Sequence, residues 1–269
     1  MIALVVQART GSTRCPGKVL AEIAGRPMLA LMLERLALAR TPDAKVVLAT
    51  TTEPADDPLA QLGHALGVET FRGHPTDLLD RHLRAAQAVG ARAVAKIPSD
   101  CPLVDPRVVE RVLGAYLAEE GRVDYVGNLH PASWPDGNDV EVMSVEALAT
   151  AHREAERPHE REHTTPFLWD HPERFRVRSV VWGAGRDLSM SHRFTVDYPD
   201  DVAFVRAVFE ALLPTKGLGF SVDDVCALLD ERPEIFALNA RYAGVNWYRH
   251  HLGELNTVDE KETRWPTDP

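Results

Sequence analysis

Short apolar runs alternate with helical segments along the first half of the chain, and this alternation restricts the fold more than any other feature. Residues 1–6, 45–50 and 92–97 have the length and the Val-containing composition of buried strands. Helical spacing lies between them, most clearly in the Leu- and Ala-rich residues 27–40. We expect further helices at residues 58–66, 77–89 and 105–119 and a strand at 68–71. This order predicts an α/β fold with a mostly parallel sheet and helices on both faces.

The pattern changes after Tyr125. Residues 128–137 are rich in turn formers, and residues 139–143 alternate like a strand. Beyond them the sequence predicts helices at 144–153, 158–170, 200–213 and 221–229, and strands at 176–182 and 192–196. No repeat or low-complexity linker interrupts the chain. We therefore expect a single domain over residues 1–251 with an inserted smaller lobe at about 126–196, and a mobile polar tail over residues 252–269.

The charge balance restricts the partners. The chain has 269 residues, and its 30 Lys and Arg against 40 Asp and Glu give a formal net charge of -10. A nucleic-acid partner is not expected, because such binding needs a broad positive field. A small anion held in a local basic pocket remains compatible with this charge.

The cysteines and the N-terminus indicate the compartment. Cys15, Cys101 and Cys226 lie far apart and form no C-x-x-C motif, which indicates a reducing environment. The first apolar run is too short for a signal peptide, and no run of about 18 apolar residues could cross a membrane. We expect a cytoplasmic protein that does not enter a membrane.

A basic, glycine-containing loop, Q-A-R-T-G-S-T-R-C-P-G-K, follows the first strand at residues 7–18. Glycines let a backbone approach phosphates, main-chain N–H groups donate to them, and cations neutralise their charge. The loop is therefore interpreted as an anion site, with a solvated basic surface loop as the alternative. It is not a Walker A loop, because five residues separate Gly11 from Gly17-Lys18 and Val19 replaces the Mg²⁺-binding hydroxyl.

Two aspartates follow predicted strands at the same sheet edge as the loop. Asp100 lies in I-P-S-D-C-P-L and Asp197 in F-T-V-D-Y-P-D-D. Strand-end carboxylates of this kind can hold Mg²⁺ against a nucleotide's phosphates, since Mg²⁺ usually takes one or two carboxylates plus substrate phosphates. Each aspartate could instead be a helix cap. Asp56 and Asp57 are interpreted as a solvated surface.

The segment His159–His163 fits H-E-x-x-H, a zinc-protease motif. Its flanks, Arg157-Pro158 and Thr164-Thr165-Pro166, do not supply the apolar helix face that such a site needs, and no further His-containing extension follows. A zinc hydrolase is therefore the weaker hypothesis for this chain.

The motifs taken together resemble those of the sugar-acid cytidylyltransferases, which include the CMP-Kdo and CMP-sialic acid synthetases, and especially the spore-coat polysaccharide (SpsF-like) branch. The loop at residues 7–18 is the most specific match. The others follow in family order from about residue 2 to about 205. They are R-G-H-P-T-D-L-L-D-R, S-D-C-P-L, P-D-G-N-D-V-E-V-M, R-E-H-T-T-P-F and T-V-D-Y-P-D-D. The R-E-H match also accounts for the zinc-protease motif.

The resemblance implies a GT-A-like (Rossmann-like) nucleotidyltransferase fold, CTP as donor, Mg²⁺ as cofactor and a homodimer. By position in the motifs, it implies that the nucleotide is bound by Gln7, Arg9, Ser12, Arg14, Lys18, Arg72 and Asp77, the last two near the nucleoside. It implies Asp100 and Asp197 as Mg²⁺ ligands, and Arg14, Lys18 and Asp100 as catalytic residues. Ser99, Cys15 and Asn138 depart from the family pattern, and Asn138 could alter the acceptor pocket.

The implied reaction is transfer of CMP from CTP to an acidic sugar, a nonulosonic or Kdo-like acid, with release of pyrophosphate, for surface polysaccharide or glycan biosynthesis. A phosphonate or sugar-phosphate acceptor, or a non-catalytic nucleotide-binding protein, remain alternatives. No residue stands out as the general base. The inserted lobe is expected to serve acceptor binding or dimerisation.

Overall fold

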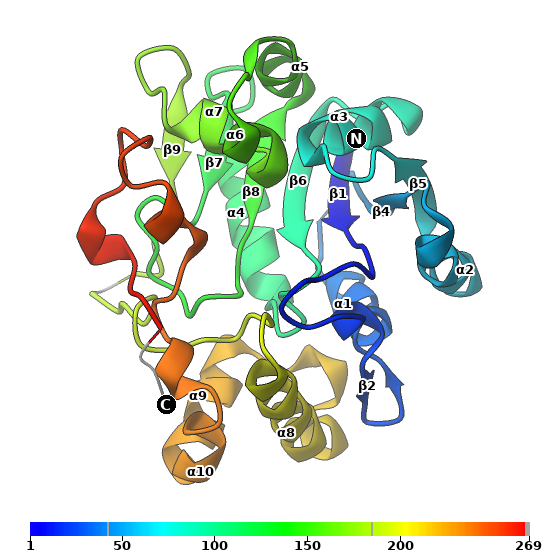
Figure 1. The fold of residues 1–269 in the computed structure, drawn as a ribbon, viewed down its shortest axis with the longest axis vertical. Coiled ribbons are helices and arrows are strands. Elements are labelled where there is room, and N and C mark those ends of the chain that lie inside the picture. The colour runs from blue at the N-terminus through cyan, green and yellow to red at the C-terminus, as the bar shows by residue number, and fades with distance from the viewer. Residues whose placement is uncertain (42, 184, 267–269) are drawn as a thin grey trace.

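A seven-stranded sheet forms the centre of the protein in a computed structural model that describes residues 1–41, 43–183 and 185–266 (Figure 1). The strand order is β5-β4-β1-β6-β8-β7-β9. Four neighbouring strands run parallel: β1 (Ile2–Gln7), β4 (Ala44–Thr51), β5 (Glu69–Gly73) and β6 (Ala93–Pro98). β8 (Glu141–Ser144) is antiparallel to β6 and to β7 (Tyr125–Gly127), and β9 (Val177–Ser179) is parallel to β7. The prediction of a mostly parallel sheet is confirmed.

Helices cover both faces of the sheet, and alternate residues of β1 point to the two sides. Ile2, Leu4 and Val6 join one buried cluster with α1 (Met28–Leu36), α2 (Asp57–Ala65), α4 (Pro106–Ala118), α8 (Pro199–Lys216) and α9 (Val222–Glu231). Ala3 and Val5 join a second cluster with α3 (Leu78–Ala88), α5 (Val145–Glu154) and α7 (Pro166–Trp169). The period of two in the strand therefore produces two separate cores.

The predicted inserted lobe does not build a sheet of its own in the described residues. Its strands β7, β8 and β9 widen the main sheet. The prediction of a single helix at 158–170 is wrong. It divides into α6 (Pro158–His163) and α7, because Thr164 between them has φ 72°. The strand predicted at 192–196 is instead an irregular segment with one bridge, from Arg193 to Asp136, and a bend at Thr195.

The remaining elements are short. β2 (Glu22–Ile23) and β3 (Arg26–Pro27) form a hairpin, and α10 (Pro233–Phe236) follows α9. Single 3-10 turns lie at Lys18–Leu20, Pro54–Asp56, Gly217–Gly219, Ala240–Tyr242, Trp247–His250 and Glu260–Glu262. Across the described residues, no helix is both long and apolar enough to cross a membrane.

The C-terminal segment differs from the predicted mobile tail. Leu255 and Val258 are buried in the second core cluster. The Asp170 carboxylate accepts hydrogen bonds from the backbone N–H groups of Asn256 and Thr257, at 2.8 Å each. Residues 252–266 therefore pack against the domain, and residues 267–269 of the predicted tail lie outside the described residues.

Candidate active site

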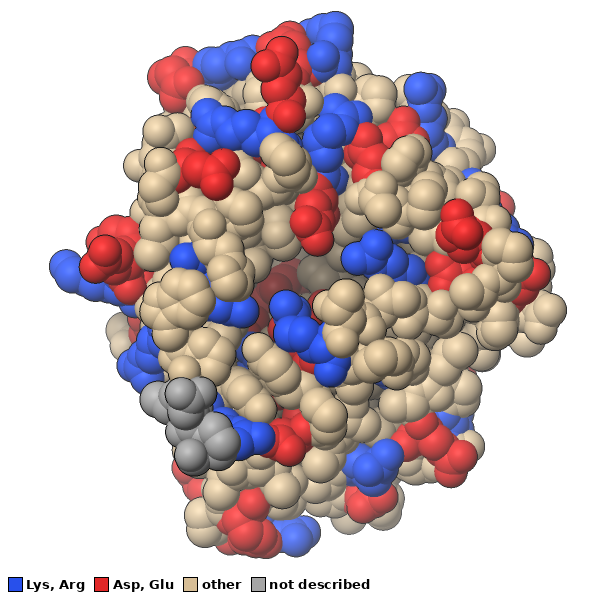
Figure 2. Space-filling view, viewed as in Figure 1, with Lys and Arg blue, Asp and Glu red and all other residues tan. Residues whose placement is uncertain are grey.

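A cavity of about 550 Å³ lies at the carboxyl ends of β1 and β6. The loop after β1, the turn after β6, the segments 128–141 and 193–198, and C-terminal residues 245–250 line it. Figure 2 shows a hollow in the middle of this face, with Lys and Arg side chains around its edge and acidic side chains deeper inside. Ligands in open α/β sheets bind at this edge.

The basic loop is fixed from below by a buried carboxylate. Asp56 is 3% exposed and accepts a hydrogen bond from the Thr10 backbone N–H at 2.7 Å, as well as bonds from the hydroxyls of Thr10 and Thr51. The Gly17 N–H closes the loop onto the Thr10 carbonyl at 3.0 Å, and Gly17 has φ 70°. The interpretation of Asp56 as a solvated residue is wrong, since it anchors the loop.

Lys18 lies between the two predicted metal ligands. Its Nζ atom is 3.2 Å from Asp100 Oδ2 and 3.2 Å from Asp197 Oδ1, and it also donates to the Val196 carbonyl. Burial alone would lower the pKa of Lys18, but the two carboxylates outweigh it and the pKa is raised. Arg14 adds a second cation, 2.6 Å from Asp197 Oδ1.

Asp197 is held from its other side by a buried arginine. The Arg193 guanidinium, whose side chain is 1% exposed, lies 3.0 Å from Asp197 Oδ2 and 3.0 Å from Asp201 Oδ1. Asp201 in turn accepts the backbone N–H of Asp197 at 2.8 Å. Burial would raise the pKa of Asp197, but Lys18, Arg14 and Arg193 hold it well below its usual range. The carboxylate is therefore ionised and fixed in place.

A second charged pair lies deeper in the cavity. Lys96 on β6 and Glu141 on β8 are cross-strand neighbours, with Nζ and Oε2 2.6 Å apart. The hydroxyls of Tyr125 and Thr165 donate to Glu141 Oε1 at 2.8 Å and 2.6 Å. Burial would raise the pKa of Glu141, but Lys96 and then the Thr165 hydroxyl lower it. The pair gives the cavity a polar floor.

Two further acidic groups in the lining are pushed toward their neutral forms. Burial raises the pKa of Asp136 to about 7, although Arg193 opposes this, and nearby carboxylates add to the rise. Burial and Asp136 raise the pKa of Asp139 well above its ordinary value. Asn138, between them, accepts a hydrogen bond from the Asp105 N–H at 3.0 Å, so its amide also fixes the start of α4.

The structure brings together most of the predicted site residues. Those that line the cavity are Gln7, Arg9, Ser12, Arg14, Lys18, Asp100 and Asp197. Arg72 and Asp77 are absent from the lining. The Arg72 guanidinium binds the Thr51 carbonyl at 2.8 Å and the Asp57 carboxylate at 2.7 Å. Asp77 caps α3 and pairs with Arg161 at 2.6 Å.

Several lining residues escaped the sequence interpretation. Lys96 had a usable signal, because it is a charged residue inside an otherwise apolar strand, and Glu141 had a weaker one, because it alternates with valines at the start of β8. Arg81 lies on the amphipathic helix α3 and is 1% exposed, which its helical spacing alone does not distinguish from surface pairing. Arg249 comes from the polar C-terminal segment, where no pattern marks it.

Known proteins are similar to this chain in sequence. Residues 3–217 match the family model described as cytidylyltransferase. The spore coat polysaccharide biosynthesis protein SpsF of Bacillus subtilis is 27% identical over 237 residues, covering 87% of this chain and 95% of that protein. A 3-deoxy-manno-octulosonate cytidylyltransferase of Geobacter sulfurreducens is 40% identical over 125 residues, 45% of this chain and 47% of that enzyme.

A solved structure extends the likeness to the fold. A cytidylyltransferase from Leptospira borgpetersenii superposes with a TM-score of 0.81 at 28% identity, over 87% of this chain and 96% of that one. The expected Rossmann-like nucleotidyltransferase fold is therefore confirmed. With the family model matching most of its length, this chain belongs to the cytidylyltransferase family of nucleotidyltransferases.

Proposed function

We propose that the protein is a Mg²⁺-dependent cytidylyltransferase that transfers CMP from CTP to an acidic sugar, a nonulosonic or Kdo-like acid, and releases pyrophosphate. The product would serve surface polysaccharide or glycan biosynthesis. The observation that carries the proposal is the position of Lys18, whose ammonium lies between the carboxylates of Asp100 and Asp197 at the mouth of the cavity.

The two carboxylates fit a divalent cation. An oxygen of Asp100 and one of Asp197 each lie 3.2 Å from the same positively charged atom, so both already face one position of positive charge. Oxygen ligands of this kind suit Mg²⁺, which takes one or two carboxylates together with substrate phosphates. When bound, Mg²⁺ would neutralise charge on the triphosphate and the leaving pyrophosphate.

The chain's own residues would bind and orient the nucleotide. Arg9 and Ser12 line the cavity from the basic loop, whose backbone is held by Asp56. Arg14 and Lys18 would stabilise charge on the phosphoryl oxygens as an acceptor oxygen attacks the α-phosphorus and the bond to the β-phosphate oxygen breaks. Because the cations are held by Asp197 beforehand, little reorganisation is needed at that moment.

Two arginines in the lining whose positive charge is only partly compensated support an acidic acceptor. Burial and the neighbouring Arg9 lower the pKa of Arg81 to about 10. Burial lowers the pKa of Arg249; Tyr198 opposes this, and the charge of Arg14 adds to it. Both arginines line the cavity, and a negatively charged group there would supply further countercharge. An acceptor carboxylate or phosphate therefore binds more favourably than a neutral sugar.

The test is pyrophosphate release with CTP, Mg²⁺ and a panel of acidic sugars, a phosphonate and a sugar phosphate, with ATP, GTP and UTP as controls. We expect release with CTP and an acidic sugar, and a loss of about 100-fold or more in Lys18→Ala and Asp100→Ala. Lys45→Ala is the matched control, because its exposed pair with Glu69 lies on the outer part of the sheet.

Three outcomes would contradict parts of the proposal. Undiminished release in both site variants would remove the assigned roles of Lys18 and Asp100. Release with only the phosphonate or the sugar phosphate would change the acceptor class. Thermal stabilisation by CTP without turnover of any acceptor would favour a non-catalytic nucleotide-binding protein.

A further inference from the structure

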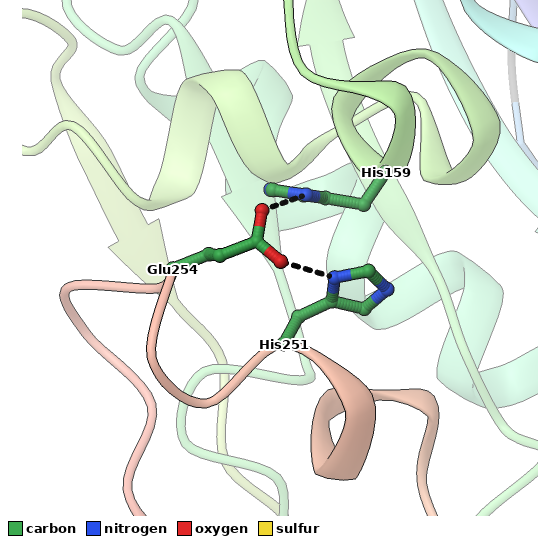
Figure 3. A group of neighbouring side chains, drawn as sticks. All are labelled: His159, His251 and Glu254. Carbon is green, nitrogen blue, oxygen red and sulfur yellow. Dashed lines mark hydrogen bonds and ion pairs between the residues drawn. The ribbon is translucent and has the colours of Figure 1, made fainter.

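The geometry points to a second metal site, for a Zn²⁺-class cation, formed by His159, His251 and Glu254, which fastens the C-terminal segment to α6 (Figure 3). His159 comes from α6. His251 and Glu254 come from the turn that follows the 3-10 helix Trp247–His250. This site is separate from the predicted Mg²⁺ ligands, and it does not depend on the proposed transfer reaction.

The spacing of the three side chains suits one ion. Glu254 Oε2 is 3.3 Å from His159 Nδ1, and Glu254 Oε1 is 3.0 Å from His251 Nδ1. One ligating atom from each residue can be chosen so that all three lie within 4.8 Å of one another. Bonds of about 2.0–2.1 Å at tetrahedral angles place neighbouring ligand atoms roughly 3.3–3.4 Å apart. Small side-chain rotations would therefore complete the site.

His159 supplies an independent reason to expect a ligand. Its side chain is 1% exposed, and neither ring nitrogen has a hydrogen-bond partner within the described residues. Glu254 lies near Nδ1 as an ion-pair neighbour but does not complete a hydrogen bond. Buried polar atoms are normally bonded, so an unpartnered imidazole calls for an explanation.

The ligand types favour Zn²⁺ over Mg²⁺. Two imidazoles and one carboxylate form a donor set typical of zinc, whereas Mg²⁺ prefers oxygen ligands throughout. Half of the Glu254 side chain is exposed, so water can reach the ion as a fourth ligand. The ion would bridge two parts of the chain about 90 residues apart in sequence, which is how a structural site holds a segment in place.

This arrangement differs from the zinc-protease motif in the same helix. His163 is stacked on Trp247, with ring centroids 3.8 Å apart, and it does not belong to the cluster. Glu160 accepts the Arg157 backbone N–H at 3.0 Å and caps α6. The motif's second histidine and its glutamate therefore make other contacts. They do not act here as the second zinc ligand and the general base that a zinc protease needs.

Fastening this segment matters because it lines the cavity. Trp247, Tyr248 and Arg249 all belong to the lining, and Arg249 is two residues before the first C-terminal ligand, His251. A cation at the cluster would hold these side chains over the cavity, and its loss would let the segment open more readily.

Titration of the full-length, EDTA-treated protein with ZnCl₂ in competition with a chromophoric chelator tests the site directly. We expect about one equivalent bound, and a rise in Tm of about 5 °C at a free Zn²⁺ concentration 100 times the Kd. Affinity should fall at least tenfold in His251→Ala and in Glu254→Gln, and both side chains are exposed enough for these variants to fold. Glu173→Gln is the matched control, because Glu173 pairs with His171 at 3.1 Å and, in the part of the chain that the structure describes, no third candidate ligand joins them.

A second readout follows the segment itself. Zn²⁺ should slow hydrogen exchange of residues 246–258 in the natural sequence and leave it unchanged in Glu254→Gln. Equal Zn²⁺ affinity in the natural sequence and in both ligand variants would overturn the proposal, because it would assign the binding to other histidines. Binding that is lost in the variants without any change in exchange would overturn the fastening role. Neither result depends on CTP turnover, so failure of the proposed function leaves this test intact.

Discussion

Asp201 fixes the position of Asp197, although its own side chain does not line the cavity. It is fully buried, and it accepts hydrogen bonds from Arg193 Nε at 3.0 Å and from the backbone N–H groups of Asp197 and Tyr198 at 2.8 Å and 2.9 Å. It also receives a bond from Asn239 at 2.9 Å. The carboxylate therefore ties the turn before α8 to the arginine that neutralises Asp197.

Removal of the Asp201 carboxylate should destabilise the folded protein. In Asp201→Ala the buried Arg193 charge and two backbone N–H groups lose an acceptor, and we expect unfolding in urea to require about 3 kcal/mol less free energy. Pyrophosphate release should also fall, because Asp197 loses its support. The neighbouring Asp200→Ala is the control: its pair with Arg241 is exposed and should contribute at most about 1 kcal/mol. Equal losses in the two variants would contradict a positioning role for Asp201.

At the scale of single residues, residue type and position relative to the strands together predicted much of the site. Arg14, Lys18, Asp100 and Asp197 follow strands or precede helices at one edge, so topology brings them together. Asp77 shows where such reasoning ends. An aspartate at a helix N-terminus can cap the helix or face a ligand, and the contact that decides, here Arg161 at 2.6 Å, comes from a segment 84 residues away.

At the scale of elements, the segment 192–196 delivers Asp197 to the cavity without forming a ladder. It passes so close to the turn at Gly137 that a Cβ atom there would lie 2.5 Å from Thr195 N and 2.6 Å from Phe194 C. Gly137 also has φ 103°, which disfavours other residues. The sequence pattern predicted a strand, but it cannot distinguish a paired strand from an irregular segment held by one close approach. The break at Thr164 is hidden for a similar reason, since its flanks are helical.

The substitution Gly137→Ala should push the turn at Gly137 away from the segment 192–196. The added methyl group meets backbone atoms that cannot rotate away, so we expect about 2–4 kcal/mol lower stability in urea and weaker CTP turnover. Gly114→Ala is the opposite case, because it lies at an exposed position of α4 with no atom within 4 Å of the added Cβ. That change should stabilise by about 0.5–1 kcal/mol. A neutral Gly137→Ala would show that the turn and the segment can move apart freely.

For the whole molecule, the order of strands and helices was sufficient to predict the sheet and its two covered faces, because each strand's alternate residues must be buried on both sides. The same reasoning failed for residues 252–266. Their apolar residues are sparse, and the segment is held largely by hydrogen bonds such as those to Asp170, which leave no periodic pattern in the sequence. The homodimer stays a prediction, which light scattering on the purified protein would test.

Acid should weaken the whole fold through a buried histidine. His82 is fully buried, its Nδ1 lies 2.7 Å from the Leu78 carbonyl, and burial lowers its pKa to about 3, with Lys96 and Arg81 adding to the effect. An unfolded histidine has a pKa of about 6.5, so between these values the unfolded chain binds the proton and the folded chain does not. The contribution of the neutral ring to stability is therefore fully present above about pH 6.5 and is lost as the pH falls below it, by roughly 2 kcal/mol at pH 5.

Urea unfolding of the natural sequence and of His82→Leu at pH 7 and pH 5 measures this effect. On acidification, the free energy of unfolding of the variant should fall by about 2 kcal/mol less than that of the natural sequence. His64→Ala, at an exposed position of α2, should follow the natural sequence at both values. Parallel losses in the natural sequence and His82→Leu would mean that His82 is protonated in the folded protein at pH 5.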